Sequence, residues 1–311
     1  MDAVPYDFIE KVLTSMDRTT IMYTINGRFE SALWDKAAAD TKSKLICLHC
    51  YIAAAENGFR CQFNEYRKPT QVFSFDDVLK MDHRFTRIIN FATMDTLPES
   101  EADDLPADRL PAIIDFVSRF LLEGLSINFG LMEQKCAHLL KRLQYALFNY
   151  ELRSSELCIW YSVDALNFLK TQLLKDDLQT VNLVNVWPQE VKEDLMTFMC
   201  QPKSRRIRVD FMCFTVDDIK TIIAYWKTLE KPWTNASISM QGVDFRDEFA
   251  SCMTLYSNYE FVESFGDLRV RVLCHTPMCS INFEENGPFR NEVYSDPEDY
   301  EVYDDSDDNV D

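Results

Sequence analysis

A repeated alternation of strand-like and helix-like segments is the feature that most restricts the fold of this sequence. Five segments with strand-like patterns are centred near residues 127, 148, 182, 209 and 238. These centres are 21, 34, 27 and 29 residues apart. Between them, apolar residues recur at intervals of three and four, which indicates amphipathic helices. The second half of the chain therefore contains several strand–helix units of similar length.

Two architectures produce such a rhythm. In an irregular leucine-rich-repeat-like solenoid, each strand–helix unit stacks on the previous one. An ordinary α/β sheet with crossover helices shows the same alternation. We favour the solenoid for residues 112–256, and we expect irregular units because the regular ladder of Leu and Asn residues is missing. The predicted fold class is therefore α/β, with an α+β N-terminal part.

The predicted elements of this region differ in how clearly they are marked. In residues 205–214, Ile207 and Val209 alternate with Arg206 and Arg208, which is typical of a strand with one buried face. Residues 145–152, "YALFNYEL", are also predicted to be a strand. The longest helix is predicted where one apolar face is formed by Val216, Ile219, Ile222, Ile223, Trp226 and Leu229.

The regions on either side of the repeats have different patterns. Residues 43–96 include "KLICLHCYIAAAENGFRCQFNEY", in which Asn57-Gly58 between two apolar runs predicts an antiparallel hairpin. Residues 97–111 hold three prolines and five acids, so they are predicted to be a linker or an exposed loop. Residues 257–290 are predicted to form an antiparallel cap, with a turn at Gly266-Asp267.

The charge distribution limits the partners of the chain. The 311 residues carry a formal net charge of −19, which disfavours binding to nucleic acid or to anionic membranes. Residues 291–311 contain ten acids and no Lys or Arg, and we expect this acidic tail to be disordered. We find no secretory signal and no apolar run of ~18 residues, so we expect a location in the cytoplasm, the nucleus or both.

Residues that would mark an enzyme or a cofactor site are scarce. The seven glycines are too widely spaced for a dinucleotide fingerprint or a P-loop. Two groups have residue types that bind zinc, namely Cys47, His49, Cys50 and Cys61, and Cys274, His275 and Cys279. In a strand, however, Cys47 and Cys50 would point to opposite faces and could not converge on a metal. We predict reduced cysteines, no cofactor, no metal and no catalytic residue.

One basic cluster runs against the overall acidity of the chain. Lys203, Arg205, Arg206 and Arg208 lie close together in the sequence, and Arg269 and Arg271 alternate on another predicted strand. The cluster is either a solvated strand face or a surface that binds something acidic. The acidic tail is the nearest acidic segment, and it could compete with a partner for this surface.

The stretch "VPYDFIEKVL", residues 4–13, carries the main functional signal. Val4 and Pro5 lead into a helix, and an acid at position 7 precedes the apolar residues Phe8, Ile9, Val12 and Leu13 at helical spacing. This arrangement resembles the first line of an F-box, with Val4-Pro5 in place of the usual Leu-Pro. The resemblance implies that residues 1–42 form a segment whose apolar face docks on the Skp-type adaptor of a ubiquitin ligase. The alternative is that this face packs inside the protein.

Most of residues 1–285 also resembles a large, nematode-expanded family of largely uncharacterised F-box-like proteins with an irregular leucine-rich-repeat-like region. The shared features are the Met-Asp-x-Val-Pro motif, a Trp near residue 34, the hairpin and the irregular strand–helix units. The resemblance implies a non-enzymatic substrate-recognition protein whose repeat region holds a target protein, and we expect a monomer. Two alternatives stay open: an interaction scaffold with no link to a ligase, and an enzyme of unfamiliar type.

Overall fold

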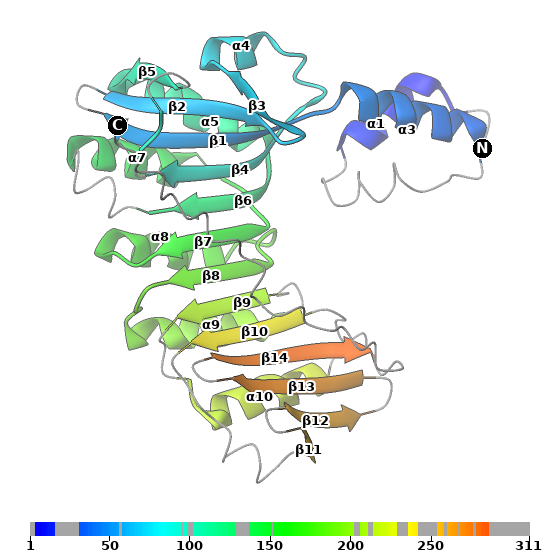
Figure 1. Cartoon of the computed structure of the whole chain (residues 1–311), viewed down its shortest axis with the longest axis vertical. Helices are drawn as coiled ribbons and strands as arrows, with labels where there is room; N and C mark the ends of the chain where they lie inside the picture. Colours follow the sequence, from blue (N-terminus) through cyan, green and yellow to red (C-terminus); the bar gives the residue numbers. More distant parts are fainter. Residues whose placement is uncertain are drawn as a thin grey trace, which may run out of the picture.

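One large sheet organises this mixed α/β protein, as the computed structural model shows (Figure 1). The strands follow the order β11-β12-β13-β14-β10-β9-β8-β7-β6-β4-β1-β2-β3, and β5 pairs with β2. The structure describes residues 4–15, 31–55, 58–94, 96–98, 102–128, 137–150, 152–201, 206–210, 214–228, 236–241, 254–257, 260–265, 268–275 and 278–285.

The centre of the sheet is parallel, and its strands are neighbours in chain order. They are β1 (Ile46–Ala55), β4 (Thr86–Met94), β6 (Leu121–Ile127), β7 (Glu156–Trp160), β8 (Thr180–Val184), β9 (Arg206–Asp210) and β10 (Ala236–Gln241). Connections between parallel neighbours are almost always right-handed. Because every connection here steps in the same direction, the intervening helices are placed on one face of the sheet.

Both ends of the sheet are antiparallel. At one end, β1 pairs with β2 (Gly58–Glu65), which pairs with β3 (Lys68–Phe73) and with β5 (Asp103–Pro106). At the other end, β10 pairs with β14 (Met278–Glu285), and the meander continues through β13 (Leu268–His275), β12 (Glu260–Phe265) and β11 (Thr254–Ser257). The predicted N-terminal hairpin and the predicted C-terminal antiparallel strands are therefore confirmed.

Helices cover one face of the sheet and form the main core with it. Figure 1 shows these helices together behind the sheet: α5 (Leu110–Phe120), α7 (Ala137–Asn149), α8 (Val163–Leu173), α9 (Lys192–Met199) and α10 (Val216–Lys227). The short helices of this part of the chain are α4 (Phe75–Lys80), η1 (Ala107–Arg109) and η2 (Gln189–Val191). Alternate strand residues such as Leu157, Val181 and Ile207 are buried beneath this helix layer. None of the described helices is long and apolar enough to cross a bilayer.

Helix α10 shows how local sequence fixes the start of a helix in this layer. Thr215 Oγ1 accepts a hydrogen bond from the Asp218 backbone N–H at 3.2 Å, and the Asp218 carboxylate accepts one from the Thr215 N–H at 2.6 Å. Lys192 Nζ lies 2.5 Å from the same carboxylate. Partial burial opposes ionisation of Asp218, but the hydrogen bonds from Lys192 and Thr215 outweigh it and lower the pKa of this carboxyl.

The first two helices, α1 (Tyr6–Ser15) and α3 (Ala32–Lys44), form a separate packing unit that projects beyond the sheet (Figure 1). Its apolar core is distinct from the main core and contains Ile9, Leu13, Ala37, Ala38, Leu45, Cys47 and Ile89. Strand β4 has a bulge at Ile89, because the pairing with β1 passes from Ile88 directly to Asn90. The bulge places Ile89 in the second core, while Ile88 remains in the main core.

Two sequence predictions need correction. Residues 145–152 were predicted to be a strand, but α7 continues to Asn149, and the strand follows at β7. Leu143, Ala146, Leu147 and Tyr150 have the three- and four-residue spacing of a helix and pack in or against the core, and the exposed Tyr145 and Phe148 obscure that period in the sequence.

The second correction concerns residues 97–111, which were predicted to be a linker or an exposed loop. This segment contains β5 and η1. Its acids have structural partners: Arg60 Nε donates to Asp104 Oδ1 at 2.9 Å, and the Phe75 N–H donates to Asp103 Oδ2 at 2.8 Å. The sheet is continuous past this segment, because β4 pairs with β6.

Candidate functional site

The face of the parallel sheet opposite the helices carries polar residues in two rows that run across the strands. In the first row, successive Cα partners are Asn90, Gly124, Glu156, Thr180 and Arg206. In the second row they are Ala92, Ser126, Cys158, Asn182 and Arg208. The residues between the rows point into the core, because side chains alternate along a strand. We call this surface the polar face.

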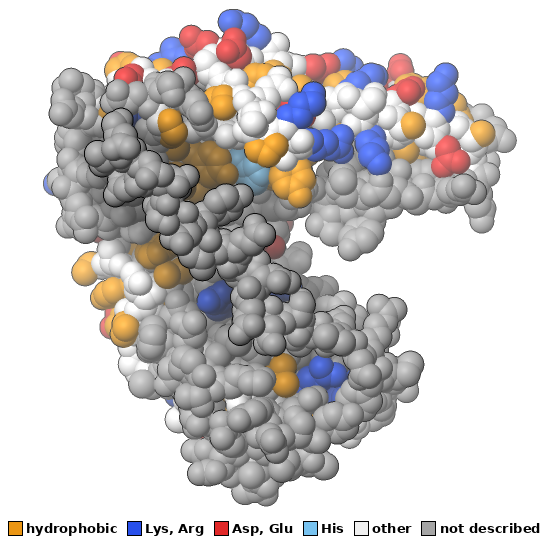
Figure 2. Space-filling view, in the orientation of Figure 1, with side chains coloured by type: hydrophobic (Ala, Val, Ile, Leu, Met, Phe, Trp, Pro, Cys, Tyr) orange, Lys and Arg blue, Asp and Glu red, His pale blue; other side chains and the backbone are white. Residues whose placement is uncertain are grey.

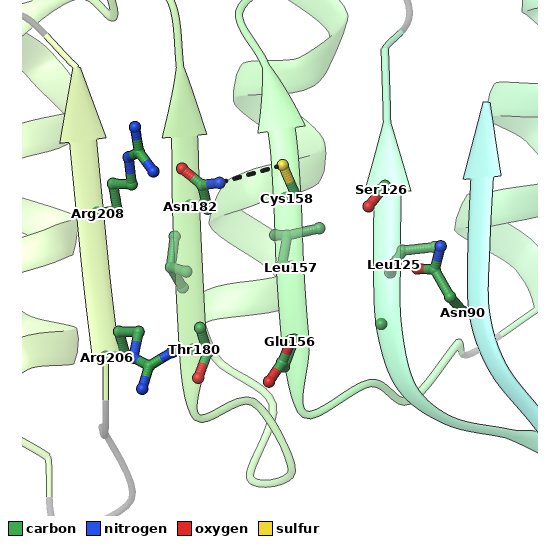
Figure 3. A pocket seen from close by; sticks show the side chains of 12 residues that line it. Asn90, Leu125, Ser126, Glu156, Leu157, Cys158, Thr180, Asn182, Arg206 and Arg208 are labelled. Atoms are coloured by element: carbon green, nitrogen blue, oxygen red, sulfur yellow. Dashed lines mark hydrogen bonds between the residues drawn. The ribbon is translucent and has the colours of Figure 1, made fainter. Parts of the chain in front are cut away.

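A shallow hollow of about 280 Å³ lies on the polar face, and Figure 3 shows its lining side chains. Asn182 Nδ2 lies 3.4 Å from Cys158 Sγ, which joins β8 to β7 in the second row (Figure 3). Gly124 leaves room for a neighbour in the first row, since a Cβ at this position would lie 2.6 Å from the Asn90 side-chain oxygen. The hollow is therefore lined by amide, hydroxyl and thiol groups that can donate or accept hydrogen bonds.

The charged groups of the polar face are exposed and separated by sign. Glu156 on β7 and Arg206 and Arg208 on β9 are exposed side chains. Figure 3 shows Arg206 beside Thr180 and Arg208 beside Asn182, with Glu156 two strands from β9. Figure 2 views the molecule from this side, and basic side chains can be seen on the face among residues of other types. The polar face thus offers a cationic side at β9 and an anionic group at β7.

Helix α1 divides its apolar residues between two stripes. Ile9 and Leu13 are fully buried in the second core, whereas Phe8 is 55% exposed. Pro5 is also exposed, and Val4 and Val12 are partly exposed. The spacing of positions 5, 8 and 12 places them on one side of the helix. The four apolar residues predicted to form one docking face therefore lie on two sides of α1, and only one side faces outward.

Several polar contacts hold α1 in place. Tyr6 donates a hydrogen bond to Asp40 Oδ2 on α3 at 2.7 Å, and this contact raises the pKa of Tyr6 to about 12. Lys44 Nζ lies 2.9 Å from Glu10 Oε1. Arg87 on β4 donates to the backbone oxygen of Thr14, and burial lowers the pKa of this guanidinium. These contacts orient α1 so that Phe8 stays outside.

The structure brings part of the predicted basic cluster to the polar face. Arg206 and Arg208 lie there, with Ile207 and Val209 buried on the other side of β9. Lys203 and Arg205 lie outside the described residues. Sequence reasoning missed Asn90, Ser126, Glu156, Thr180 and Asn182 as candidate site residues. The alternation of Leu157 and Ile159 with Glu156 and Cys158 was an available signal for β7.

In the described part of the chain, no three His, Cys, Asp or Glu side chains converge, and this includes the two groups with zinc-binding residue types that were considered in the sequence. Cys47 belongs to the second core and Cys50 to the main core, so the two point to opposite faces of β1. Burial and a hydrogen bond with Cys61 raise the pKa of the Cys50 thiol well above its usual value. These cysteines therefore pack as small apolar residues.

Comparisons of this chain with protein-family models, with curated proteins and with solved structures found no match.

Proposed function

We propose that this chain is a non-enzymatic protein-interaction module whose polar face binds a segment of a target protein. In this proposal, the seven parallel strands and their helices form an irregular leucine-rich-repeat-like solenoid. The observation that carries the proposal is the strictly sequential order of the parallel strands, with the helices on one face. Such an arrangement leaves rows of side chains on the opposite face available to an extended partner.

The chemistry of the polar face favours binding over catalysis. Cys158 has Ser126 and Asn182 as its Cα partners in the second row, and neither of these side chains is a general base. His49 lies in the first row on β1, with Asn90 and Gly124 between it and Glu156. Three strand spacings separate His49 from Glu156, or about 14 Å, which is too far for one proton relay. The described polar groups can hold a ligand by hydrogen bonds and charge.

A capture experiment tests this proposal. Asn182→Trp would fill the polar face, and Asn167→Trp on the exposed side of α8 is the matched control. Proteins captured from extract by the wild-type chain are identified by quantitative mass spectrometry. We expect at least one captured protein to be lost with Asn182→Trp and retained with Asn167→Trp. If every captured protein survives Asn182→Trp, the polar face is not the binding surface. Turnover of a metabolite by the pure chain would contradict a non-enzymatic role.

The exposed stripe of α1 supports a second element of the proposal, in which the N-terminal segment binds a Skp-type ligase adaptor. Pro5, Phe8 and Val12 are the outward residues that could contact an adaptor while α1 stays packed on α3, whereas Val4 packs against the second core. Ile9 and Leu13 would then have a purely structural role. Adaptor binding would then depend on a small apolar stripe of α1, in which Phe8 is the largest side chain.

Titration of the full chain with a purified Skp-type adaptor tests this element. We expect Phe8→Ala to weaken adaptor binding at least about tenfold, since a central aromatic often dominates a small interface. Tyr145→Ala, at another exposed aromatic on α7, is the control and should leave binding unchanged. If the adaptor does not bind the wild-type chain, the protein is better described as an interaction scaffold that has no link to a ligase.

A further inference from the structure

The polar face continues beyond the parallel strands into an arginine-flanked patch. One row runs from Arg206 through Ser237 and Asn282 to Arg271. The next row runs from Arg208 through Ser239 to Ser280. These seven residues, which we call the arginine patch, come from β9, β10, β14 and β13. Arg206 and Arg208 of the first basic pair noted in the sequence therefore share a surface with Arg271 of the second pair, whereas Arg269 is buried.

The arginine patch has a floor of small polar residues between long basic ones. Ile238, Met240, Ile281 and Val272 alternate with the patch residues and are buried in the main core, so the patch faces away from the helices. The Oγ atoms of Ser239 and Ser280 lie 3.4 Å apart. Ser237, Ser239, Ser280 and Asn282 are all partly exposed. Long side chains therefore stand on both sides of a low surface that is two strands wide.

The spacing of the basic groups defines the ligand that fits. Arg206 and Arg271 are three strand spacings apart, or about 14 Å, so both can reach an extended segment that lies over β10 and β14. Arg206 and Arg208 are two residues apart on one strand, or about 7 Å. Carboxylates at positions i and i+2 of an extended chain have the same separation. Arginine is also well suited to bind carboxylates through two parallel hydrogen bonds.

The charges around the patch restrict where an acidic segment can lie. Glu156 is in the same row as Arg206, but it lies on β7, two strands away. It would repel an acidic ligand that extended toward β7. Among the side chains that the structure describes, the arginine patch itself contains no carboxylate. An acidic segment is therefore favoured over the arginine patch, between Arg206 and Arg271, and disfavoured over the part of the hollow beside Glu156.

We propose that residues 291–311 of this chain bind the arginine patch. This segment carries ten acids and no base, and its acids repeat at the required spacing: Asp296 with Glu298, Asp299 with Glu301, and Asp305 with Asp307. The patch residue Asn282 is on β14, which ends at Glu285. Only five residues, 286–290, separate β14 from the acidic segment, and they can span up to about 17 Å. The segment can therefore reach the patch within the same molecule.

Binding of the acidic segment would regulate access to the polar face. Arg206 and Arg208 belong both to the patch and to the lining of the hollow. A target that uses these two arginines must displace the segment first. This competition rests on the proposed function, whereas binding of the segment itself does not. A tethered segment acts at an effective concentration on the order of millimolar, so even weak contacts would keep it bound.

Peptide binding to the full-length chain tests the inference. A fluorescein-labelled peptide of residues 291–311 is titrated with two proteins and followed by anisotropy at low salt. One is the wild-type chain, and the other is a full-length variant in which the ten acids of the segment are changed to amides, as in Asp296→Asn and Glu298→Gln. We expect the amide variant to bind the peptide at least about tenfold more tightly, because its own segment no longer competes.

Charge reversal in the patch identifies the site. In the amide variant, Arg206→Glu with Arg208→Glu should weaken peptide binding by roughly tenfold or more, and added salt should weaken it further. Lys141→Glu with Arg142→Glu changes the net charge equally at two exposed positions on α7 and should alter binding less than about twofold. Arg206→Gln with Arg208→Gln is a milder pair that should give an intermediate loss, and circular dichroism verifies that each variant is folded.

Three results would overturn the inference. The first is equal binding of the peptide by the wild-type chain and by the amide variant. The second is equal weakening by the patch pair and by the control pair on α7. The third is equal binding of a reordered peptide that has the same ten acids but none two residues apart, which would identify acidic segments of other proteins as the occupant. No target protein is present in this assay, so its failure is distinct from a failure of the capture experiment.

Discussion

The second core predicts that Leu13 and Phe8, two apolar residues of one helix, respond very differently to truncation. Leu13 is fully buried in that core, and a buried Leu→Ala change typically costs ~3–5 kcal/mol. Phe8 is 55% exposed. A fully buried Phe side chain contributes about 1.5–3 kcal/mol, so Phe8→Ala should cost about 1 kcal/mol at most. We therefore expect Leu13→Ala to weaken α1 docking by at least about 2 kcal/mol more than Phe8→Ala.

Hydrogen exchange measures this difference where it arises. Because the second core is separate from the main core, α1 can open without unfolding of the sheet. A loss of about 3 kcal/mol corresponds to roughly 150-fold faster exchange of α1 amides, and 1 kcal/mol to about fivefold. Amides of β7 and β8 serve as the internal reference and should keep their wild-type rates in both variants.

Equal acceleration of α1 exchange by Phe8→Ala and Leu13→Ala would refute the two-stripe description of α1. Faster exchange in β7 and β8 after Leu13→Ala would show instead that the two cores unfold together. The outcome also decides how adaptor binding can be tested. Only if Phe8→Ala leaves α1 docked does a loss of adaptor binding report a direct contact.

Three further predictions concern the sheet, a helix start and the cysteines. Gly58→Ala places a Cβ 2.1 Å from a backbone oxygen of β5 and should lower the free energy of unfolding by about 1–3 kcal/mol in urea titrations. Gly124→Ala meets only a movable side-chain oxygen and should cost less than about 1 kcal/mol; equal losses would contradict this. The folded pKa of Asp218 is lowered, so its contribution is full above the unfolded value of ~3.9 and is lost as pH falls through the folded pKa. The stability gap between the wild type and Asp218→Asn should therefore shrink from pH 5 to pH 2, and a constant gap would be inconsistent with that pKa. The Cys50 thiol, whose pKa burial raises, should resist iodoacetamide at pH 8 while the partly exposed Cys158 reacts, as peptide mass spectrometry would show; the reverse order would contradict the assigned burial.

The fold could be predicted from the sequence where residues close together in the chain determine the secondary structure. The alternation around Ile207 and Val209 marks β9 correctly, and Asn57-Gly58 between apolar runs marks the β1–β2 pair. The pattern failed at α7, where the exposed aromatics Tyr145 and Phe148 obscure the helical period. It also failed at β5, whose acids are held by Arg60 and by the N–H of Phe75. The structure of such segments depends on contacts with residues that are distant in the sequence, and a local sequence pattern does not reveal those contacts.

The candidate site was predictable only in part, for a related reason. Strand alternation indicates that Arg206 and Arg208 share a face, and the structure agrees. Which residues stand beside them depends on register between strands, and therefore on pairings such as Thr180 with Arg206. Likewise, helical spacing groups Phe8 with Ile9, Val12 and Leu13, but the position of α3 selects which of them become buried. One helix in isolation cannot specify its inward side.

The bulge in β4 allows one strand to contribute side chains to both the main core and the second core. Ile88 and Phe91 are three positions apart, yet both enter the main core, since the additional residue restores the alternation. Ile89 meanwhile supports the helical pair at the edge of the sheet. Removing Ile89 would leave β1 and β4 paired through the same partners, but it would take one apolar side chain out of the second core. Substitutions in α1 and α3 that create contacts with new partners can therefore accumulate without changing the pairing of the strands that follow β4.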